Sequence, residues 1–348
     1  MVHSNCKYIA DIREVAMKDL PWHKIKNKRI LITGAGFICS FLSDVLMYRN
    51  SLFNSNIEIY IIAKNQQKAQ IKFKDYFNHP LFHFIKHDIN KPLELNIDFD
   101  YIVHGASNTH PIAYASDPIG TITTNVFGTY NLLSSAKAGL KKFILLSSVE
   151  IYGENNREIE QFKEDDFGYI NCNSVRAGYP ESKRISESLC QAFIENKKID
   201  SSIVRLCRVY GPSEDTDSKA SAQFIRNGLK KEDIVLKSKG NQQYSYIYLS
   251  DAASAIFYIM FYGKNGEAYN VADEASNITL HEFADLVAKV CDTKVIFDLP
   301  KETEIKGFSV VTKALINPQK LKKLGWYATT SIEQGIHKTL EILNKTIC

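Results

Sequence analysis

From Lys28 onward, short apolar runs alternate with longer amphipathic stretches, and this alternation restricts the possible folds more than any other feature. The runs are RILIT (29–33), IEIYIIA (57–63), FHFI (82–85), YIVH (101–104), FILL (143–146) and SSIVRL (201–206). Runs of this length are typical of strands that are buried on both faces, and the stretches between them suit crossover helices. The pattern therefore predicts an α/β protein with a doubly wound parallel sheet.

The regular alternation ends after VYGPSED (209–215), where shorter segments such as IVLKSKG, YSYIYLS and EAYNVAD follow. We predict a first domain at 28–210 and a smaller, mixed α/β C-terminal substrate lobe at 211–348. Segments around 243–275 are candidates for a return to the first domain. Apolar residues at helical spacing between 8 and 20, ended by Pro21, predict an N-terminal helical extension at 1–27. A ligand is expected between the two lobes.

Composition excludes several classes of protein. Of the 348 residues, 45% are hydrophobic and 24% are charged, which is typical of globular proteins. The net charge of +4 is too small and too dispersed to indicate a nucleic-acid or membrane partner. No apolar run is as long as a membrane span, and the first residues carry Asp and Glu where a signal peptide is apolar. We therefore expect a cytoplasmic protein.

The seven cysteines are odd in number and form no Cys-x-x-Cys pair. Reduced and mostly buried thiols are expected, in preference to a disulfide framework or a zinc site. No metal is predicted.

A glycine-containing turn, TGAGFICSFL, directly follows the first predicted strand and opens a helix. Gly34 and Gly36 permit a tight turn, and the backbone N–H groups at the start of the helix are suited to a pyrophosphate. Cys39 stands where the third glycine of this pattern is usual. The turn and the parallel sheet together predict a Rossmann-type dinucleotide-binding domain; a purely structural turn is the alternative.

The second predicted strand ends in IIAKNQQK, so Ala63 and Lys64 stand where a carboxylate would accept the ribose hydroxyls of NAD. Lys64 and Lys68 would suit the 2′-phosphate of NADP, or both are solvated surface lysines. The cofactor is therefore predicted to be NAD or NADP. Asp88, after the third strand, is a candidate for the adenine edge, and HGAS (104–107) offers small residues for close approach of a cofactor.

Polar residues follow the fifth predicted strand in LLSSVEIYGE (145–154). If the strand continues, Ser148, Glu150 and Tyr152 face the same side; a strand that runs out into a solvated turn is the alternative. Further along, Tyr179 and Lys183 lie four residues apart on a predicted helix and share a face. An ammonium beside a phenol lowers the pKa of the phenol from about 10, which favours its use as a base.

Taken in order, the motifs resemble those of one family. They are TGAGFIC, HGAS, DPIGTITTNVFGTYNLL, SSVEIYG, YPESK, RVYGP and YIYLSDAASAI. With them, the chain resembles an extended short-chain dehydrogenase/reductase of the nucleotide-sugar epimerase/dehydratase group over residues 28 to about 330. EDDFGYINCNSVRAGYPESKR is most similar to UDP-glucuronate decarboxylases and hexose 4,6-dehydratases.

The resemblance implies roles for five residues. Ser148 and Tyr179 would hold the sugar 4-hydroxyl, Tyr179 would take its proton, and the C4 hydride would pass to the nicotinamide. Lys183 would bind the nicotinamide ribose, and Asn125 would support the proton relay. Glu150 matches the glutamate that removes the C5 proton in the dehydratases and that the decarboxylases keep. Oxidation at C4 followed by dehydration or decarboxylation at C5/C6 is therefore the predicted activity.

Two departures from the family pattern concern the substrate. Val149 stands where hexose 4,6-dehydratases usually place an aspartic acid that protonates the departing 6-hydroxyl. Tyr244 stands where relatives commonly carry an arginine for the substrate diphosphate or carboxylate. Lys219, Arg226 and Arg208 are possible replacements, or surface and structural charges; Tyr244 itself would stack on a base or sugar, or pack in the core.

The predicted site residues fall into two further sets. Predicted cofactor contacts are Gly34, Gly36, Phe37, Ile38, Lys64, Asp88, Ile89, Gly105, Ala106, Ser107, Ser147, Tyr179 and Lys183. Predicted substrate contacts are Ser107, Ser148, Lys219 and Tyr244.

Two alternative functions remain at this point. One is a nucleotide-sugar epimerase or 4-keto reductase that uses the same Ser, Tyr and Lys. The other is a dinucleotide-binding sensor without turnover. In relatives, the helices that correspond to 118–138 and 178–197 form the dimer contact, so the resemblance also implies a homodimer.

Overall fold

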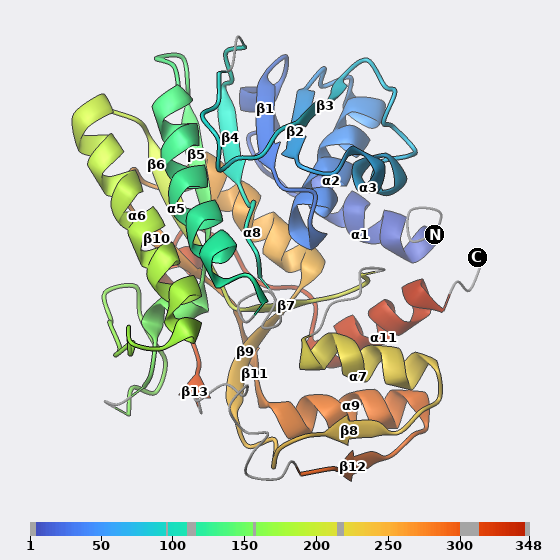
Figure 1. The fold of residues 1–348 in the computed structure, drawn as a ribbon. Helices are drawn as coiled ribbons and strands as arrows, with labels where there is room; N and C mark the ends of the chain where they lie inside the picture. The colour runs from blue at the N-terminus through green and yellow to red at the C-terminus, as the bar shows by residue number, and fades with distance from the viewer. Residues whose placement is uncertain are drawn as a thin grey trace.

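The computed structural model describes residues 5–94, 97–109, 116–155, 158–213, 219–299 and 313–344. Its centre is a seven-stranded sheet in the order β10-β6-β5-β4-β1-β2-β3, and all of its pairings are parallel (Figure 1). The strands are β1 (Arg29–Thr33), β2 (Glu58–Ala63), β3 (Phe82–Lys86), β4 (Tyr101–His104), β5 (Lys142–Ser148), β6 (Ser201–Leu206) and β10 (Ala268–Val271). The predicted Rossmann-type doubly wound sheet is confirmed.

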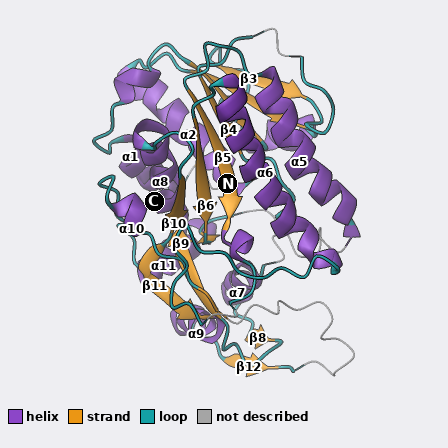
Figure 2. Ribbon diagram, turned by 90° about the vertical axis from the view of Figure 1, so that its left-hand side faces the viewer, coloured by secondary structure: helices purple, strands orange, loops and turns teal. Residues whose placement is uncertain are grey.

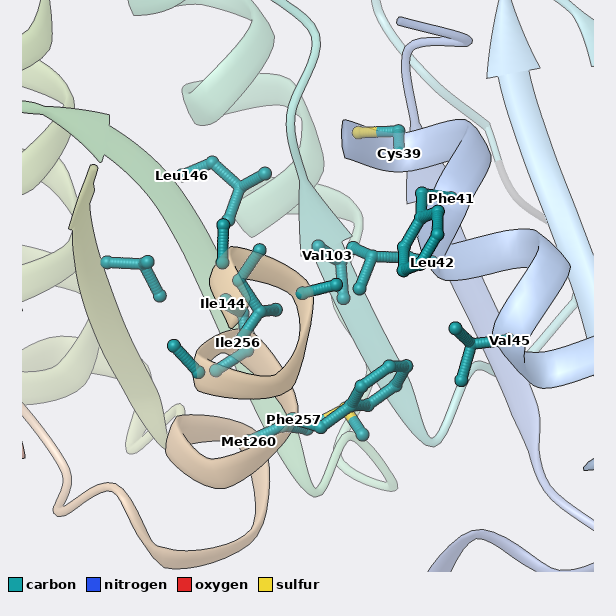
Figure 3. Close-up of a cluster of buried hydrophobic side chains, with 14 of the residues drawn as sticks. Cys39, Phe41, Leu42, Val45, Val103, Ile144, Leu146, Ile256, Phe257 and Met260 are labelled. Carbon is teal, nitrogen blue, oxygen red and sulfur yellow. The ribbon is translucent and has the colours of Figure 1, made fainter. Parts of the chain in front are cut away.

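Helices cover both faces of this sheet because its buried residues point alternately to the two sides. On β1, Ile30 and Ile32 join the hydrophobic cluster of α2 (Phe37–Phe53) and α8 (Leu249–Tyr262), whereas Leu31 joins that of α5 (Pro118–Ser135) and α6 (Gly178–Lys197). Figure 3 shows the first cluster. Leu42 and Val45 of α2 and Ile256 and Met260 of α8 gather there over the strand residues Val103, Ile144 and Leu146.

All six strands predicted from apolar runs are present. EAYNVAD, which lies in the 243–275 stretch named as a candidate for a return to the first domain, is not part of the second lobe. Its residues 268–271 form β10, which pairs in parallel with β6 at the edge of the main sheet. Tyr269, Asn270 and Val271 are each at most 1% exposed. A strand that is buried on both faces must lie in a sheet that is covered on both sides, as the main sheet is. This explains why β10 pairs with β6 although the two are far apart in sequence. The predicted domain boundaries themselves stay predictions.

The remaining strands form a smaller lobe below the main sheet (Figure 2). One mixed sheet joins β7 (Arg208–Tyr210), β9 (Gln243–Tyr248), β11 (Asp273–Thr279) and β13 (Lys313–Ala314). A two-stranded parallel sheet joins β8 (Ile234–Leu236) and β12 (Val295–Phe297). The helices α7 (Ala220–Leu229), α9 (Leu280–Cys291) and α11 (Ile332–Leu343) pack around a second core that includes Tyr246 and Phe283.

The predicted N-terminal helix is α1 (Cys6–Ala16), and it contacts both parts of the molecule (Figure 1). Its Asp11 is 2% exposed, accepts a hydrogen bond from the Tyr248 hydroxyl (2.6 Å) and pairs with Lys338 of α11 (2.9 Å). The other short helices are η2 (Trp22–Ile25), α3 (Gln66–Lys72), η3 (Val149–Tyr152), η4 (Val175–Ala177) and α10 (Gln319–Lys322).

The prediction of reduced thiols is wrong for Cys6, which is disulfide-bonded. Cys6 is the first residue of α1 and is exposed, so burial does not keep its sulfur from forming a disulfide. The cysteines described as free are Cys39, Cys172, Cys190, Cys207 and Cys291, and Cys348 lies outside the described residues.

None of the described helices is both long and apolar enough to cross a bilayer. Within the same described ranges, no three His, Cys, Asp or Glu side chains form a group that could hold a metal ion.

Candidate active site

The glycine turn leaves open space at the start of α2. Gly34 has a φ of +86°, in the left-handed region that favours glycine, and its N–H donates to the carbonyl of Ile62 (2.8 Å). Gly36 immediately precedes α2, and a Cβ built on it would meet no atom within 4 Å. The start of α2 therefore borders open space, which fits a pyrophosphate held by backbone N–H groups.

Phe37 and Ile38 form the first turn of α2 and pack, partly buried, against the main hydrophobic cluster. Cys39 follows them and is 4% exposed. Its thiol donates to the carbonyl of Thr33 (3.5 Å), and burial raises the pKa of this thiol to about 12. At the usual position of the third glycine, Cys39 is therefore a neutral packing residue.

A buried hydrogen-bond chain links β1, β4 and α5, and sequence reasoning missed it. His104 lies between the hydroxyls of Thr33 (2.7 Å from Nδ1) and Thr129 (3.1 Å from Nε2). Burial lowers the pKa of His104 to about 3, and the nearby charge of Lys183 lowers it further in the same direction. The N–H of Ala106 donates to the Thr33 hydroxyl (3.2 Å), so a neutral His104 fixes the backbone of the HGAS segment.

The predicted adenine-ribose end of the groove contains an ion pair. Lys64 Nζ lies 3.6 Å from the Asp88 carboxylate, and both side chains are partly exposed. Ile89 is 3% exposed, and its side chain faces Gly128 of α5. Ser107 follows Ala106 and is half-buried. Because Asp88 neutralises Lys64, the pair weakens the case for a 2′-phosphate at this place.

Of the two alternatives for the residues after Ser148, the continued strand is wrong, and the turn that replaces it is not solvated at Ile151 and Tyr152, which are each 1% exposed. β5 ends at Ser148, and Val149–Tyr152 form the 3₁₀ helix η3, in which side chains no longer alternate between two sides. The Ser148 hydroxyl accepts a hydrogen bond from the N–H of Glu150 (3.2 Å) and caps this turn. Ser148 and Glu150 stay half-buried.

Tyr152 turns away from Ser148 and Glu150 into the core. It is 1% exposed. Its hydroxyl donates a hydrogen bond to the side chain of Asn270 (2.6 Å) and accepts one from Arg205 (3.0 Å). Its ring stacks on Phe162, with 4.9 Å between centroids. Tyr152 therefore anchors η3 rather than contributing to the site.

Glu150 has a basic partner that the sequence reasoning passed over. Nη2 of Arg176 lies 3.4 Å from each of the Glu150 carboxylate oxygens. Arg176 belongs to η4 and precedes Tyr179 by three residues. This short distance in sequence from a predicted catalytic tyrosine is the signal that could have identified Arg176 as a site residue. The contact holds η3 against the start of α6.

Tyr179 and Lys183 lie in the first two turns of α6 and are 5% and 3% exposed. Lys183 Nζ donates to the carbonyl of Leu146 (2.8 Å), two residues before Ser148, and lies 6.0 Å from the centroid of the Tyr179 ring. Burial lowers the pKa of Lys183 to about 8, although Glu187 opposes this shift. Lys183 and Arg176, on either side of Tyr179 in sequence, both contact the segment that carries Ser148 and Glu150.

Asn125 of α5 is 1% exposed, and its amide nitrogen donates to the Ser182 hydroxyl on α6 (2.8 Å). Its Oδ1 is buried and has no hydrogen-bond partner among the described residues. Such an orphaned acceptor is costly unless water or a ligand satisfies it. This agrees with, without testing, the relay role that the resemblance implies.

The hydroxyl of Ser147 belongs to a buried hydrogen-bond network. It donates to Glu187 (2.5 Å), which also pairs with Arg205 of β6 (2.8 Å). Arg205 in turn reaches the Tyr152 hydroxyl. This buried network, which sequence reasoning also missed, ties β5, β6, η3 and α6 together, so the Ser147 hydroxyl has a structural role. Its backbone as a cofactor contact stays a prediction.

The predicted substrate residues of the smaller lobe lie on β9 and at the start of α7. Tyr244 is 5% exposed, and the guanidinium of Arg208 lies over its ring, 3.5 Å from the centroid. Lys219 is the N-terminal cap residue of α7 and is half-buried. Roles of these residues in binding stay predictions.

Comparison with known proteins agrees with the motifs. The model of the NAD-dependent epimerase/dehydratase family matches residues 30–272. This chain belongs to that family. UDP-glucuronic acid decarboxylase 3 of Arabidopsis thaliana is 31% identical over 312 residues, which cover 89% of this chain and 87% of the relative. UDP-glucuronic acid decarboxylase 1 of Xenopus tropicalis is 28% identical over 331 residues, 92% of this chain and 73% of the relative.

Solved structures of epimerase/dehydratase family enzymes share the fold of this family member. A dTDP-glucose 4,6-dehydratase of Streptomyces venezuelae, solved with NAD bound, superposes with a TM-score of 0.78 at 22% identity, covering 91% of this chain and 97% of that one. UDP-glucose 4-epimerase of Thermotoga maritima, solved with UDP-glucose, superposes with a TM-score of 0.76 at 23% identity, covering 92% of this chain and 100% of that one. At these identities the likeness concerns the fold.

Proposed function

We propose that the protein is an NAD-dependent enzyme that oxidises a nucleotide sugar at C4 and then decarboxylates it at C5/C6. The observation that carries this proposal is the double attachment of the Tyr179 helix to the end of β5, through Lys183 to Leu146 and through Arg176 to Glu150. It supports the assignment of Ser148, Tyr179 and Lys183 to oxidation at C4, and of Glu150 to the following step.

In this proposal, bound NAD supplies the acceptor for the C4 hydride. Ser148 and Tyr179 hold the 4-hydroxyl, Tyr179 takes its proton, and the positive charge of Lys183 favours the phenolate. Lys183 is largely protonated at neutral pH, because its pKa of about 8 lies above this pH. The Lys64–Asp88 ion pair and the family description support NAD rather than NADP.

The second step follows from the product of the first. A 4-keto sugar with a carboxylate on C5 is a β-keto acid, which releases carbon dioxide without a protonated leaving group. Val149 cannot protonate a departing 6-hydroxyl, so decarboxylation suits this site better than dehydration. The named relatives are UDP-glucuronic acid decarboxylases, which makes UDP-glucuronic acid the first substrate to test. In this proposal Glu150, held by Arg176, transfers the proton at C5.

The experiment is product analysis by mass spectrometry. The purified enzyme is incubated with NAD and, separately, UDP-glucuronic acid, UDP-glucose, dTDP-glucose and GDP-mannose. Loss of carbon dioxide from UDP-glucuronic acid is expected. Loss of water from a hexose would instead indicate a dehydratase, and unchanged mass with altered stereochemistry an epimerase. No product and no NADH with any sugar would support the sensor and contradict the proposal.

A homodimer is part of the proposal. The outer side of α5 exposes large apolar side chains: Ile119 is 75% exposed, and Phe127 and Tyr130 are each 51% exposed. Ile185 of the adjacent α6 is 45% exposed. A second copy of the same two helices would cover this side in a two-fold arrangement. Location in the cytoplasm also stays part of the proposal.

A further inference from the structure

Within the described residues, Arg208 of β7 has no carboxylate partner. We infer that Arg208, held in place by Tyr244, binds the diphosphate of the nucleotide-sugar substrate. The inference rests on the proposed function and assigns the anionic part of that substrate to this chain's own residues.

Arg208 lies next to the site through the pairing of β5 with β6. Ser148, the last residue of β5, is opposite Leu206, the last residue of β6, and Arg208 follows two residues later as the first residue of β7. In open α/β sheets, ligands bind outside the carboxyl ends of the strands. Figure 1 shows β7 and β9 where the main sheet meets the smaller lobe, below the ends of β5 and β6.

The guanidinium lies over a buried aromatic ring. Its central carbon lies 3.5 Å from the centroid of Tyr244, which is 5% exposed and belongs to the neighbouring strand β9. Stacking fixes the plane of the guanidinium and uses its face, while the N–H groups at its edge remain available. An edge with two parallel N–H donors matches two phosphate oxygens.

The charge balance indicates an anionic ligand. Arg208 is half-buried and makes no ion pair with a carboxylate among the residues that the structure describes. Arg205, three residues earlier, is neutralised by Glu187 at 2.8 Å. Arg49, also stacked on an aromatic ring, donates to the carbonyl of Ala16 at 2.8 Å. A partly desolvated guanidinium without such a partner binds a dianion more strongly than a fully solvated one does.

The arrangement also explains Tyr244 at a position where an arginine was expected from the resemblance. Tyr244 does not replace the cation; it is the surface on which a cation from β7 is positioned. Arg208 is then a substrate-binding residue, and Tyr244 is a positioning residue that acts through it.

The test compares binding of UDP and of uridine by isothermal titration calorimetry, with dTDP and thymidine as a second pair of probes. The wild-type protein is expected to bind each diphosphate more tightly than its nucleoside. Arg208→Met should weaken diphosphate binding about 10- to 100-fold and leave nucleoside binding within about twofold, because bidentate charged hydrogen bonds are lost. Arg208→Lys should fall between the two, because it keeps the charge but not the paired donors.

Three further variants separate stacking from packing. Tyr244→Leu should weaken diphosphate binding about threefold to tenfold, whereas Tyr244→Phe, which keeps the ring, should leave it unchanged. Arg49→Met is the matched control, since it removes an arginine stacked on Phe53 near the C-terminal end of α2 and should change no affinity. Thermal melts show whether each variant is folded. If Arg208→Met does not fold, Arg208→Lys still tests the inference.

The inference is overturned if folded Arg208→Met and Arg208→Lys bind diphosphates as the wild type does, or if the wild type binds diphosphate and nucleoside equally. The proposed function is tested separately by wild-type turnover. Turnover with an unchanged KM in Arg208→Met rejects the inference alone. Loss of diphosphate affinity in Arg208→Met without turnover of any sugar by the wild type rejects the proposed reaction and leaves the anion site standing.

Discussion

The thiol of Cys39 fills the space that a side chain at residue 105 would need. A Cβ built on Gly105 would meet the Cys39 sulfur first, then the side chain of Leu146 at 3.1 Å and the carbonyl of Thr33 at 3.4 Å. Gly105 has no positive φ, so alanine there is excluded by this contact and not by its backbone. The unusual cysteine in the glycine turn is therefore matched by a glycine at the end of β4.

This match predicts that Gly105→Ala destabilises the protein by about 1–3 kcal/mol, because the new methyl group overlaps the Cys39 sulfur. Cys39→Gly should relieve the overlap, so the double variant should be more stable than the sum of the single changes predicts, by about 0.5–3 kcal/mol. Urea unfolding of the four proteins measures this coupling. Additive effects of the two changes would show that the residues do not share the space.

Lys183 is predicted to reduce stability at neutral pH. Its folded-state pKa of about 8 lies below the ordinary 10.5, so the unfolded chain binds more protons between these values and native stability rises with pH across this window. Lys183→Met should therefore be more stable than wild type at pH 7 by about 1–3 kcal/mol, with an advantage that shrinks above pH 8.

Urea unfolding at pH 7 and pH 10 without cofactor tests this, and the same variant should lose hydride transfer. A less stable Lys183→Met at pH 7 would mean that the hydrogen bond to the Leu146 carbonyl outweighs the burial of the charge.

Glu150→Gln is predicted to separate the two chemical steps. The variant should still transfer hydride from C4, because Ser148, Tyr179 and Lys183 are unchanged. Formation of the decarboxylated sugar should fall about 10²- to 10⁴-fold, because it requires proton transfer at C5. NADH absorbance in single turnover measures the oxidation, and mass spectrometry of the decarboxylated sugar measures the second step. Tyr179→Phe serves for comparison and should reduce both; equal loss of both steps in Glu150→Gln would place Glu150 in the oxidation itself.

The apolar side of α5 is predicted to form the dimer contact. Tyr130→Glu should produce a monomer in sedimentation velocity, because a buried, unpaired carboxylate opposes association. Ile71→Glu is the matched control. Ile71 is 70% exposed and lies in α3, which packs on the α2 face of the main sheet and not on the α5 face. This variant should leave the dimer intact. A wild-type monomer at micromolar concentration, or an intact Tyr130→Glu dimer, would contradict this interface.

The strands and the catalytic helix could be predicted from sequence because their signals are local. Apolar runs such as RILIT, and the four-residue spacing of Tyr179 and Lys183, express the period of the backbone itself. The glycine turn is equally local, since only glycine adopts the φ of residue 34 readily.

Tertiary contacts decided what local periodicity could not. β5 ends at Ser148 because that residue caps η3 and Tyr152 finds buried partners on Arg205 and Asn270, far along the chain. The return of β10 to the main sheet and the placement of Arg208 on Tyr244 likewise depend on pairings between distant segments. The free energy of these contacts comes from burial and charge pairing between segments that are far apart in sequence. The sequence of one segment alone therefore does not predict which distant residues it contacts.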